Sequence, residues 1–155
     1  MHIPIKVDYG VRALVDLAMD TTDSPVRAAD IARRTAIPEQ FLAQVLHTLS
    51  RSGFVKSQRG PTGGHSLAIE ATEIRLSEVV VALGGPDTPV GCLDDTNMCI
   101  HVPACAQREV WRSVADAVFK ILNSTTIADL ADRTRVVTSA VGGNSPSEPV
   151  DFVVA

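Results

Sequence analysis

The amino-acid sequence predicts a mainly α-helical protein with one small β-hairpin, a winged helix-turn-helix followed by a long dimerisation helix. Two helical patterns, at residues 26–35 and 38–52, are joined by a very short connection. A glycine-rich turn at 59–65 lies between two short segments of strand-forming residues. A stripe of apolar residues then continues over 104–122, which indicates one long helix.

The clearest helical pattern begins at Pro38 and ends near Ser52. Proline is tolerated in the first turn of a helix, where its missing N–H would be unpaired, and Gly53 suits the left-handed residue that closes one. Two helices joined by a tight turn are typical of the DNA-binding helix-turn-helix. The apolar face of the second helix is formed by Phe41, Leu42, Val45, Leu46 and Leu49.

Residues 54–58 and 65–69 are expected to form the two strands of the hairpin. The turn between them holds three glycines and a proline, so its tip carries few side chains. Such a tip can approach a phosphate backbone closely, and Arg59 at its base can supply a positive charge or enter a minor groove. The alternative is an ordinary surface hairpin, but its position after a helix-turn-helix favours DNA contact.

We predict that the base-reading side chains lie at the start of the second helix and in the wing. Glutamine reads adenine through two hydrogen bonds, and glutamate accepts one from cytosine N4. Arg12, on the first helix, is a candidate phosphate contact, with a solvated surface arginine as the alternative. The full set of candidate DNA-binding residues is Arg12, Pro38, Glu39, Gln40, Gln44, Arg59, Gly60, Gly63 and Gly64.

The charge balance argues against strong DNA binding by a single copy. The formal net charge is -4 and the pI is about 5.5, whereas DNA-binding modules are usually basic. The acidic residues lie mainly downstream, because residues 1–70 carry eight basic and seven acidic side chains and residues 71–155 carry six and eleven. Phosphate contacts dominate DNA affinity, so this balance favours a protein that binds as a dimer.

The apolar stripe of residues 104–122 is long for so small a domain. It extends over about four helical turns and needs a partner surface, for which the same helix of a second copy is the simplest choice. The alternative is packing on its own domain. We therefore predict a DNA-binding domain at 1–83, a cysteine-bearing sensor loop at 84–103, a dimerisation helix and short terminal helix at 104–135, and a flexible tail at 136–155.

The three cysteines bear on the cellular compartment of the protein and form a second candidate site. All three, Cys92, Cys99 and Cys105, fall within fourteen positions, and an odd number of cysteines cannot all pair within one chain. We expect a reducing cytoplasm, since no export signal is evident, and no membrane segment, since the longest clear apolar run is only Val79–Leu83. We also expect no enzyme, because neither a P-loop nor a paired carboxylate site is present.

Clustered thiolates suit zinc, copper(I) and iron-sulfur clusters. The intervals between these cysteines are wider than the short knuckles of zinc sites, which argues mildly against structural zinc. His101 is the nearest alternative fourth donor for zinc. Three unliganded thiols are the remaining alternative.

Over about residues 1–135 the chain resembles the Rrf-type winged-helix transcription regulators, a family that includes the iron-sulfur regulators IscR and NsrR. The wing run from Arg59 to Gly64 is specific for that family. The later short helix, three-cysteine loop and Trp111 helix also follow in the family's order. The other matching segments are residues 6–14, 31–32, 37–42, 45–49 and 53–55.

The resemblance implies a homodimer that reads a palindromic operator in double-stranded DNA and carries an iron-sulfur cluster, 4Fe-4S rather than 2Fe-2S, on its three cysteines. Some members use a histidine three residues after the last cysteine, where this chain has Arg108. Others resemble it in having an acid at the position of Asp8, which would ligate the cluster of the partner subunit; the alternative is an ordinary acid near a helix N-terminus.

The expected function is therefore control of operator binding by a cluster that responds to nitric oxide, redox or iron status. The alternative function is the same DNA-binding fold without a cluster, with sensing through cysteine thiol oxidation or a small ligand.

Overall fold

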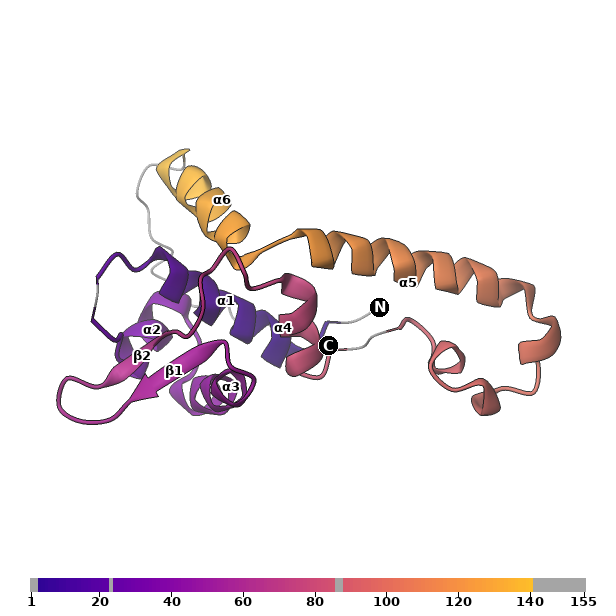
Figure 1. Cartoon of the computed structure of the whole chain (residues 1–155), viewed down its shortest axis with the longest axis horizontal. Coiled ribbons are helices and arrows are strands. Elements are labelled where there is room, and N and C mark those ends of the chain that lie inside the picture. Colours follow the sequence, from indigo (N-terminus) through magenta and orange to yellow (C-terminus); the bar gives the residue numbers. More distant parts are fainter. Residues whose placement is uncertain (1–2, 23, 86–87, 141–155) are drawn as a thin grey trace.

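A computed structural model describes residues 3–22, 24–85 and 88–140. Within them, a two-stranded antiparallel hairpin and several helices form a compact head, and one long helix projects from it (Figure 1). This is the predicted winged helix-turn-helix with a long additional helix. The elements are α1 (Ile5–Met19), α2 (Ala28–Thr35), α3 (Glu39–Arg51), β1 (Val55–Gln58), β2 (Gly64–Leu67), α4 (Leu76–Ala82), η1 (Gly91–Leu93), η2 (Thr96–Met98), η3 (Val102–Ala104), α5 (Ala106–Ser124) and α6 (Ile127–Ala140).

The hydrophobic core lies where α1, α2, α3, α4 and the start of α6 meet. The apolar positions of α3 that were predicted to face the core are buried, with the exception of Phe41, which is 46% exposed. Phe41 directly precedes the buried Leu42, and neighbouring residues of a helix point in different directions. Its ring therefore lies at the edge of the core, beside the ring of Tyr9. The largest fully buried side chains are Leu14, Ile31, Leu42, Leu46, Leu49, Ile74, Val79, Leu83 and Ile127.

Helices α1 and α4 approach closely at Gly10. A Cβ at this position would collide with the side chain of Leu83, which is 2% exposed and would have to shift. We therefore expect Gly10→Val to lower the free energy of unfolding by about 1–3 kcal/mol through overpacking. Urea titration followed by circular dichroism measures this change.

A double-mutant cycle identifies the cause. Adding Leu83→Ala to Gly10→Val removes the obstructing side chain, so the two changes together should cost less than their separate costs added. If the effects are additive, the α1–α4 contact at Gly10 is not the source of the loss.

A charged side chain fixes the angle between the first two helices. Arg34 of α2 reaches back to Asp16, at 2.8 Å, and to Asp20, at 3.0 Å, on and just after α1. Burial raises the pKa of Asp16, whereas hydrogen bonds from Thr22 are the main cause of a lowered pKa at Asp20. The pair of carboxylates holds α2, and with it the turn into α3, in one orientation against α1.

The hairpin pairs β1 with β2, from Val55 opposite Leu67 to Gln58 opposite Gly64. Val26, just before α2, adds one more antiparallel bridge, with two 2.8 Å backbone hydrogen bonds to His65. A Cβ on Gly64 would lie 2.5 Å from the carbonyl oxygen of Val26, so this position requires glycine. The wing is thereby joined to the segment that leads into the helix-turn-helix.

Helix α6 differs from the prediction. It was expected to be short and to give way to a flexible tail at residue 136, but it continues to Ala140. Neither glycine nor proline occurs between Ile127 and Ala140, so nothing in the sequence interrupts the helix there. The rest of the predicted tail, residues 141–155, lies outside the described residues.

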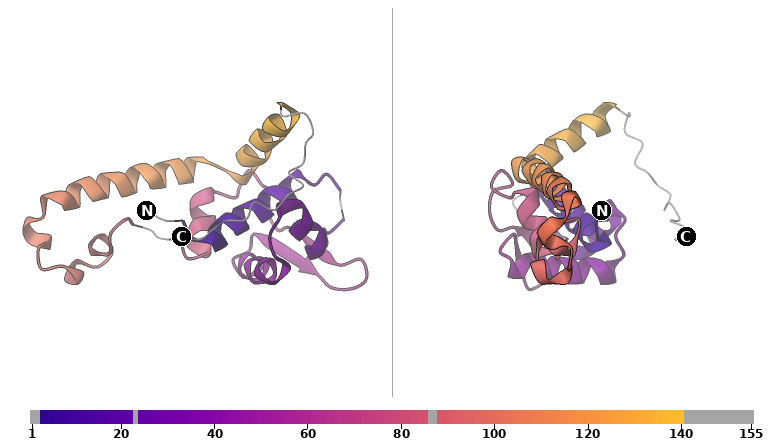
Figure 2. Two further views of the ribbon diagram at one scale, coloured as in Figure 1. Left: turned by 180° about the vertical axis from the view of Figure 1, so that it is seen from behind. Right: turned by 90° about the vertical axis from the view of Figure 1, so that its right-hand side faces the viewer.

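Helix α5 leaves the head and carries the loop that precedes it at its outer end (Figures 1 and 2). None of its nineteen residues is buried. Large apolar side chains therefore face water along it, among them Val110, Trp111, Phe119 and Ile121. Across the described part of the chain, no helix combines the length and the apolarity needed to cross a membrane.

Candidate nucleic-acid interface and cysteine loop

The outward face of α3 presents a row of polar side chains. Gln40, Gln44, His47 and Arg51 follow one another at steps of four, three and four, which keeps them on one side of a helix. All four are exposed. The structure thus places the predicted readers Gln40 and Gln44 together. His47 and Arg51 were not predicted as readers, although their helical spacing from Gln44 is visible in the sequence.

The start of α3 holds the other predicted readers. Pro38 is the residue before the first turn, and its carbonyl oxygen accepts hydrogen bonds from Phe41 and Leu42, each at 3.0 Å. Glu39 is the first residue of the helix, and both side chains are exposed. The N-terminal turn of α3 is therefore open to a ligand such as the edge of a base.

Hydrogen bonds hold the turn at the tip of the wing in place. The Arg27 guanidinium donates a 3.2 Å hydrogen bond to the carbonyl oxygen of Pro61, and the Gly63 N–H donates one of 2.9 Å to Gly60. Gly60 has a φ of 116°, which a side chain would oppose. Arg59 lies exposed beside this turn and provides the wing's positive charge.

His65 adds no charge to the wing near neutral pH. Its Nδ1 lies 3.0 Å from the Ser57 hydroxyl, and partial burial lowers its pKa below the usual value. The neutral ring is therefore the expected form at pH 7.

Arg12 and Asp8 neutralise each other on α1. Their side chains form a 2.7 Å ion pair, with a second hydrogen bond of 3.2 Å, and are 47% and 45% exposed. Arg12 is thus accessible, as expected of a phosphate contact, but its charge is already balanced. Asp8 accepts its bonds from Arg12, and the structure does not bring it to the cysteines of the same chain.

The three cysteines lie on the segment at the outer end of α5. Cys92 is within η1, Cys99 directly follows η2 and Cys105 directly precedes α5. All three are free and partly exposed. Short hydrogen bonds order this loop, including those of 2.6 Å from Thr88 to Asp94 and 2.9 Å from the Asn97 N–H to Asp95.

The segment around Cys105 also contains a buried arginine nitrogen without a hydrogen-bond partner among the described residues. A pocket of about 430 Å³ is lined by Cys105 and by the side chains of Arg108, Glu109 and Arg112. The Arg108 Nε is buried and makes no hydrogen bond among the described residues. Arg108, at the position where the resemblance implies a histidine in some family members, thus places positive charge beside the Cys105 thiol.

Comparison with known proteins gives the family. The profile of the Rrf2 family, iron-dependent transcriptional regulators, matches residues 3–133. The chain belongs to the Rrf2 family. Protein rrf2 of Nitratidesulfovibrio vulgaris is 35% identical over 130 residues, which cover 84% of this chain and 87% of that protein.

Two solved Rrf2-family structures are similar in fold. CymR, the global cysteine regulator of B. subtilis, superposes with a TM-score of 0.72 at 34% identity and covers 86% of this chain and 98% of its own. IscR of T. potens superposes with a TM-score of 0.73 at 28% identity and covers 88% and 90%. These relatives confirm the winged-helix fold and its role as a DNA-binding transcription regulator.

Because the chain belongs to the Rrf2 family, its residues can be compared with those that an iron-sulfur cluster needs. The donor set suits one, because three free thiols within fourteen positions share one loop. The described residues nevertheless bring no three His, Cys, Asp or Glu side chains together as ligands. The thiols therefore match a cluster in kind, but they are not gathered in this single chain.

The predicted role of Arg59 as a phosphate contact can be measured. An arginine at the base of the wing that contacts a phosphate strengthens binding to every DNA sequence equally. We expect Arg59→Ala to weaken binding to specific and random duplexes alike, and to reduce the slope of log affinity against log salt by about one for each half-site. Fluorescence anisotropy at several salt concentrations measures both. Arg133→Ala on α6 is the control, and an equal effect there would contradict the assignment.

Proposed function

We propose that this Rrf2-family regulator binds a palindromic operator as a homodimer and that its cysteine loop controls this binding. The observation that carries the proposal is the exposed polar row of α3 beside a wing whose turn is held by a hydrogen bond from Arg27 to Pro61. Gln40 and Gln44 supply paired donors and acceptors for base edges, with His47 and Arg51 extending the row. Pro38, Glu39 and the wing glycines Gly60, Gly63 and Gly64 shape the surface around it.

Helix α5 supports the dimer. It buries none of its residues in the single chain, although its apolar stripe continues over most of its length. Pairing with the same helix of a second copy covers that stripe with a self-complementary surface. Two winged heads related by a two-fold axis then match a palindromic operator.

The proposed occupant of the loop is an iron-sulfur cluster held by Cys92, Cys99 and Cys105. Such a cluster supplies iron that reacts with nitric oxide and oxygen and that is lost when iron is scarce. Asp8 of the partner subunit is the proposed fourth ligand, and it would have to exchange its ion pair with Arg12 for the iron. Within the chain, the loop joins α5 directly at Cys105, so a change in the loop acts on the dimer helix.

Thiol sensing without a cluster is the second candidate. It is favoured by three free, partly exposed thiols that are not gathered as metal ligands in one chain, and by the similarity to the cysteine regulator CymR. In this case Cys105 would be the thiol that reacts beside the guanidinium groups of Arg108 and Arg112, because all three residues line one pocket.

Metal and sulfide analysis of protein purified without oxygen separates the two candidates. Iron matched by acid-labile sulfide, and lost in Cys99→Ser but kept in the loop control Met98→Leu, supports the cluster. Asp8→Asn should then alter the visible spectrum while the iron stays bound. Iron-free protein after reconstitution, with a DNA affinity that changes on thiol oxidation, supports the second candidate and overturns the first.

A further inference from the structure

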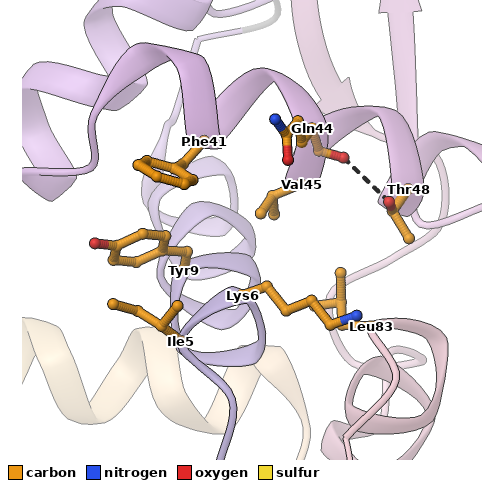
Figure 3. A pocket seen from close by; sticks show the side chains of 8 residues that line it. All are labelled: Ile5, Lys6, Tyr9, Phe41, Gln44, Val45, Thr48 and Leu83. Atoms are coloured by element: carbon orange, nitrogen blue, oxygen red, sulfur yellow. Dashed lines mark hydrogen bonds between the residues drawn. The ribbon is translucent and has the colours of Figure 1, made fainter.

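A pocket with an apolar floor opens between α1, α3 and the end of α4 (Figure 3). Its volume is about 220 Å³. Val45 and Leu83 form the floor, and Ile5 and Phe41, which are 62% and 46% exposed, stand at its edge. An apolar pocket with large exposed side chains at its edge is suited to receiving another apolar group.

The cysteine loop carries apolar side chains that have no cover in the single chain. Ile100 is 89% exposed and Met98 is 70% exposed, on either side of Cys99. The loop that carries them lies at the outer end of α5, away from the head that contains the pocket (Figure 1). The loop and the pocket of one chain therefore do not meet.

A second copy brings them together. When two α5 helices pair about a two-fold axis perpendicular to them, they run antiparallel. The outer end of one helix, with its loop, then lies beside the inner end of the other, from which α6 leads back onto α1. The pocket is on the same head, at the N-terminal half of α1.

We propose that the partner subunit's Ile100 enters the pocket of Ile5, Phe41, Val45 and Leu83, so that each pocket is completed by the other chain. This proposal rests on the dimer proposed above. The size agrees, since a cavity of about 150 Å³ accommodates a benzene molecule and one branched aliphatic side chain needs no more.

Charge also agrees with this occupant. Lys6 lines the pocket and makes no ion pair among the described residues. The cysteine loop carries two exposed acids, Asp94 and Asp95, a few residues before Ile100. Oppositely charged groups would thus flank the apolar contact on the two chains.

The contact connects the loop to the DNA-reading surface. Gln44 and Phe41 line the pocket and belong to α3, and Gln44 is also part of the outward polar row (Figure 3). When Ile100, the neighbour of Cys99, enters or leaves the pocket, the packing against α3 changes directly. Chemistry at the cysteines therefore has a short route to the recognition helix of the opposite subunit.

Disulfide trapping tests the contact, because Cys99 precedes Ile100. In Ile5→Cys, oxidation should link the new thiol to Cys99 of the second chain and give a dimer on a non-reducing gel. The link should be lost in Ile5→Cys with Cys99→Ser and should fall several-fold when Ile100→Ser is added. Glu70→Cys, exposed between β2 and α4 and outside the pocket lining, is the matched control and should not crosslink.

Failure of this contact is distinguishable from failure of the dimer. Light scattering that shows a dimer, together with a crosslink no stronger than that of Glu70→Cys, overturns the docking and leaves the dimer standing. A monomer in solution overturns both. If docking occurs, Ile100→Ser should also reduce the change in operator affinity that cysteine modification causes; an undiminished response contradicts the proposed route.

Discussion

We expect Val118→Asp to convert the protein from a dimer to a monomer and to weaken operator binding by a factor of about 10²–10⁴, the usual gain from linking two binding modules. Val118 lies at the centre of the apolar stripe of α5, between Trp111 and Leu122. A carboxylate there would have to be buried without a partner in the dimer, which is strongly unfavourable. Light scattering and a binding titration measure the two effects.

Ser113→Asp is the matched control for this prediction. It adds the same charge to the same helix at an exposed position off the apolar stripe. The control should remain dimeric and should bind operator as the wild type does. A dimeric Val118→Asp protein would show that α5 is not the dimer surface.

The second large effect is expected from the recognition helix. Gln40→Ala should weaken operator binding by about 1–3 kcal/mol for each half-site, which is the contribution of one good bidentate hydrogen-bonded contact to a base. Because a dimer has two half-sites, the total loss is twice as large. Because a base contact carries sequence information, the variant should also lose its preference at one position of each half-site. Binding to a random duplex should change little.

Selection of bound duplexes from a randomised pool measures this preference directly. Gln107→Ala, an exposed glutamine at the start of α5, is the control and should select the same sequences as the wild type. An unchanged preference in Gln40→Ala would mean that bases are read elsewhere, for example by His47 and Arg51.

The elements that could be predicted from the sequence are those set by local patterns. The apolar spacing of α3, the glycines of the wing and the long stripe of α5 each determine a short segment without reference to the rest of the chain. The contacts between segments could not be predicted in this way. The close approach of Gly10 to Leu83 and the bridge from Val26 to His65 depend on packing between distant residues.

The candidate site was predictable to a similar extent. The start of α3 and the wing follow from the helix-turn-helix pattern, whereas the continuation of the row to His47 and Arg51 was missed although its helical spacing is visible in the sequence. The tail was placed too early, although the sequence has neither glycine nor proline before Ala140 to end the helix. The arrangement of the cysteines cannot be fixed by one chain if the partner subunit completes it.

The most direct test of the account compares operator affinity before and after modification of the cysteine loop. Protein purified without oxygen would be titrated with its selected operator, then again after treatment with a nitric oxide donor or a thiol oxidant, with Cys99→Ser in parallel. We predict a change of about 5–150-fold in the wild type, the usual range of coupling between two sites, and little change in Cys99→Ser. Equal responses in both proteins, or none in either, would contradict control of DNA binding by the loop.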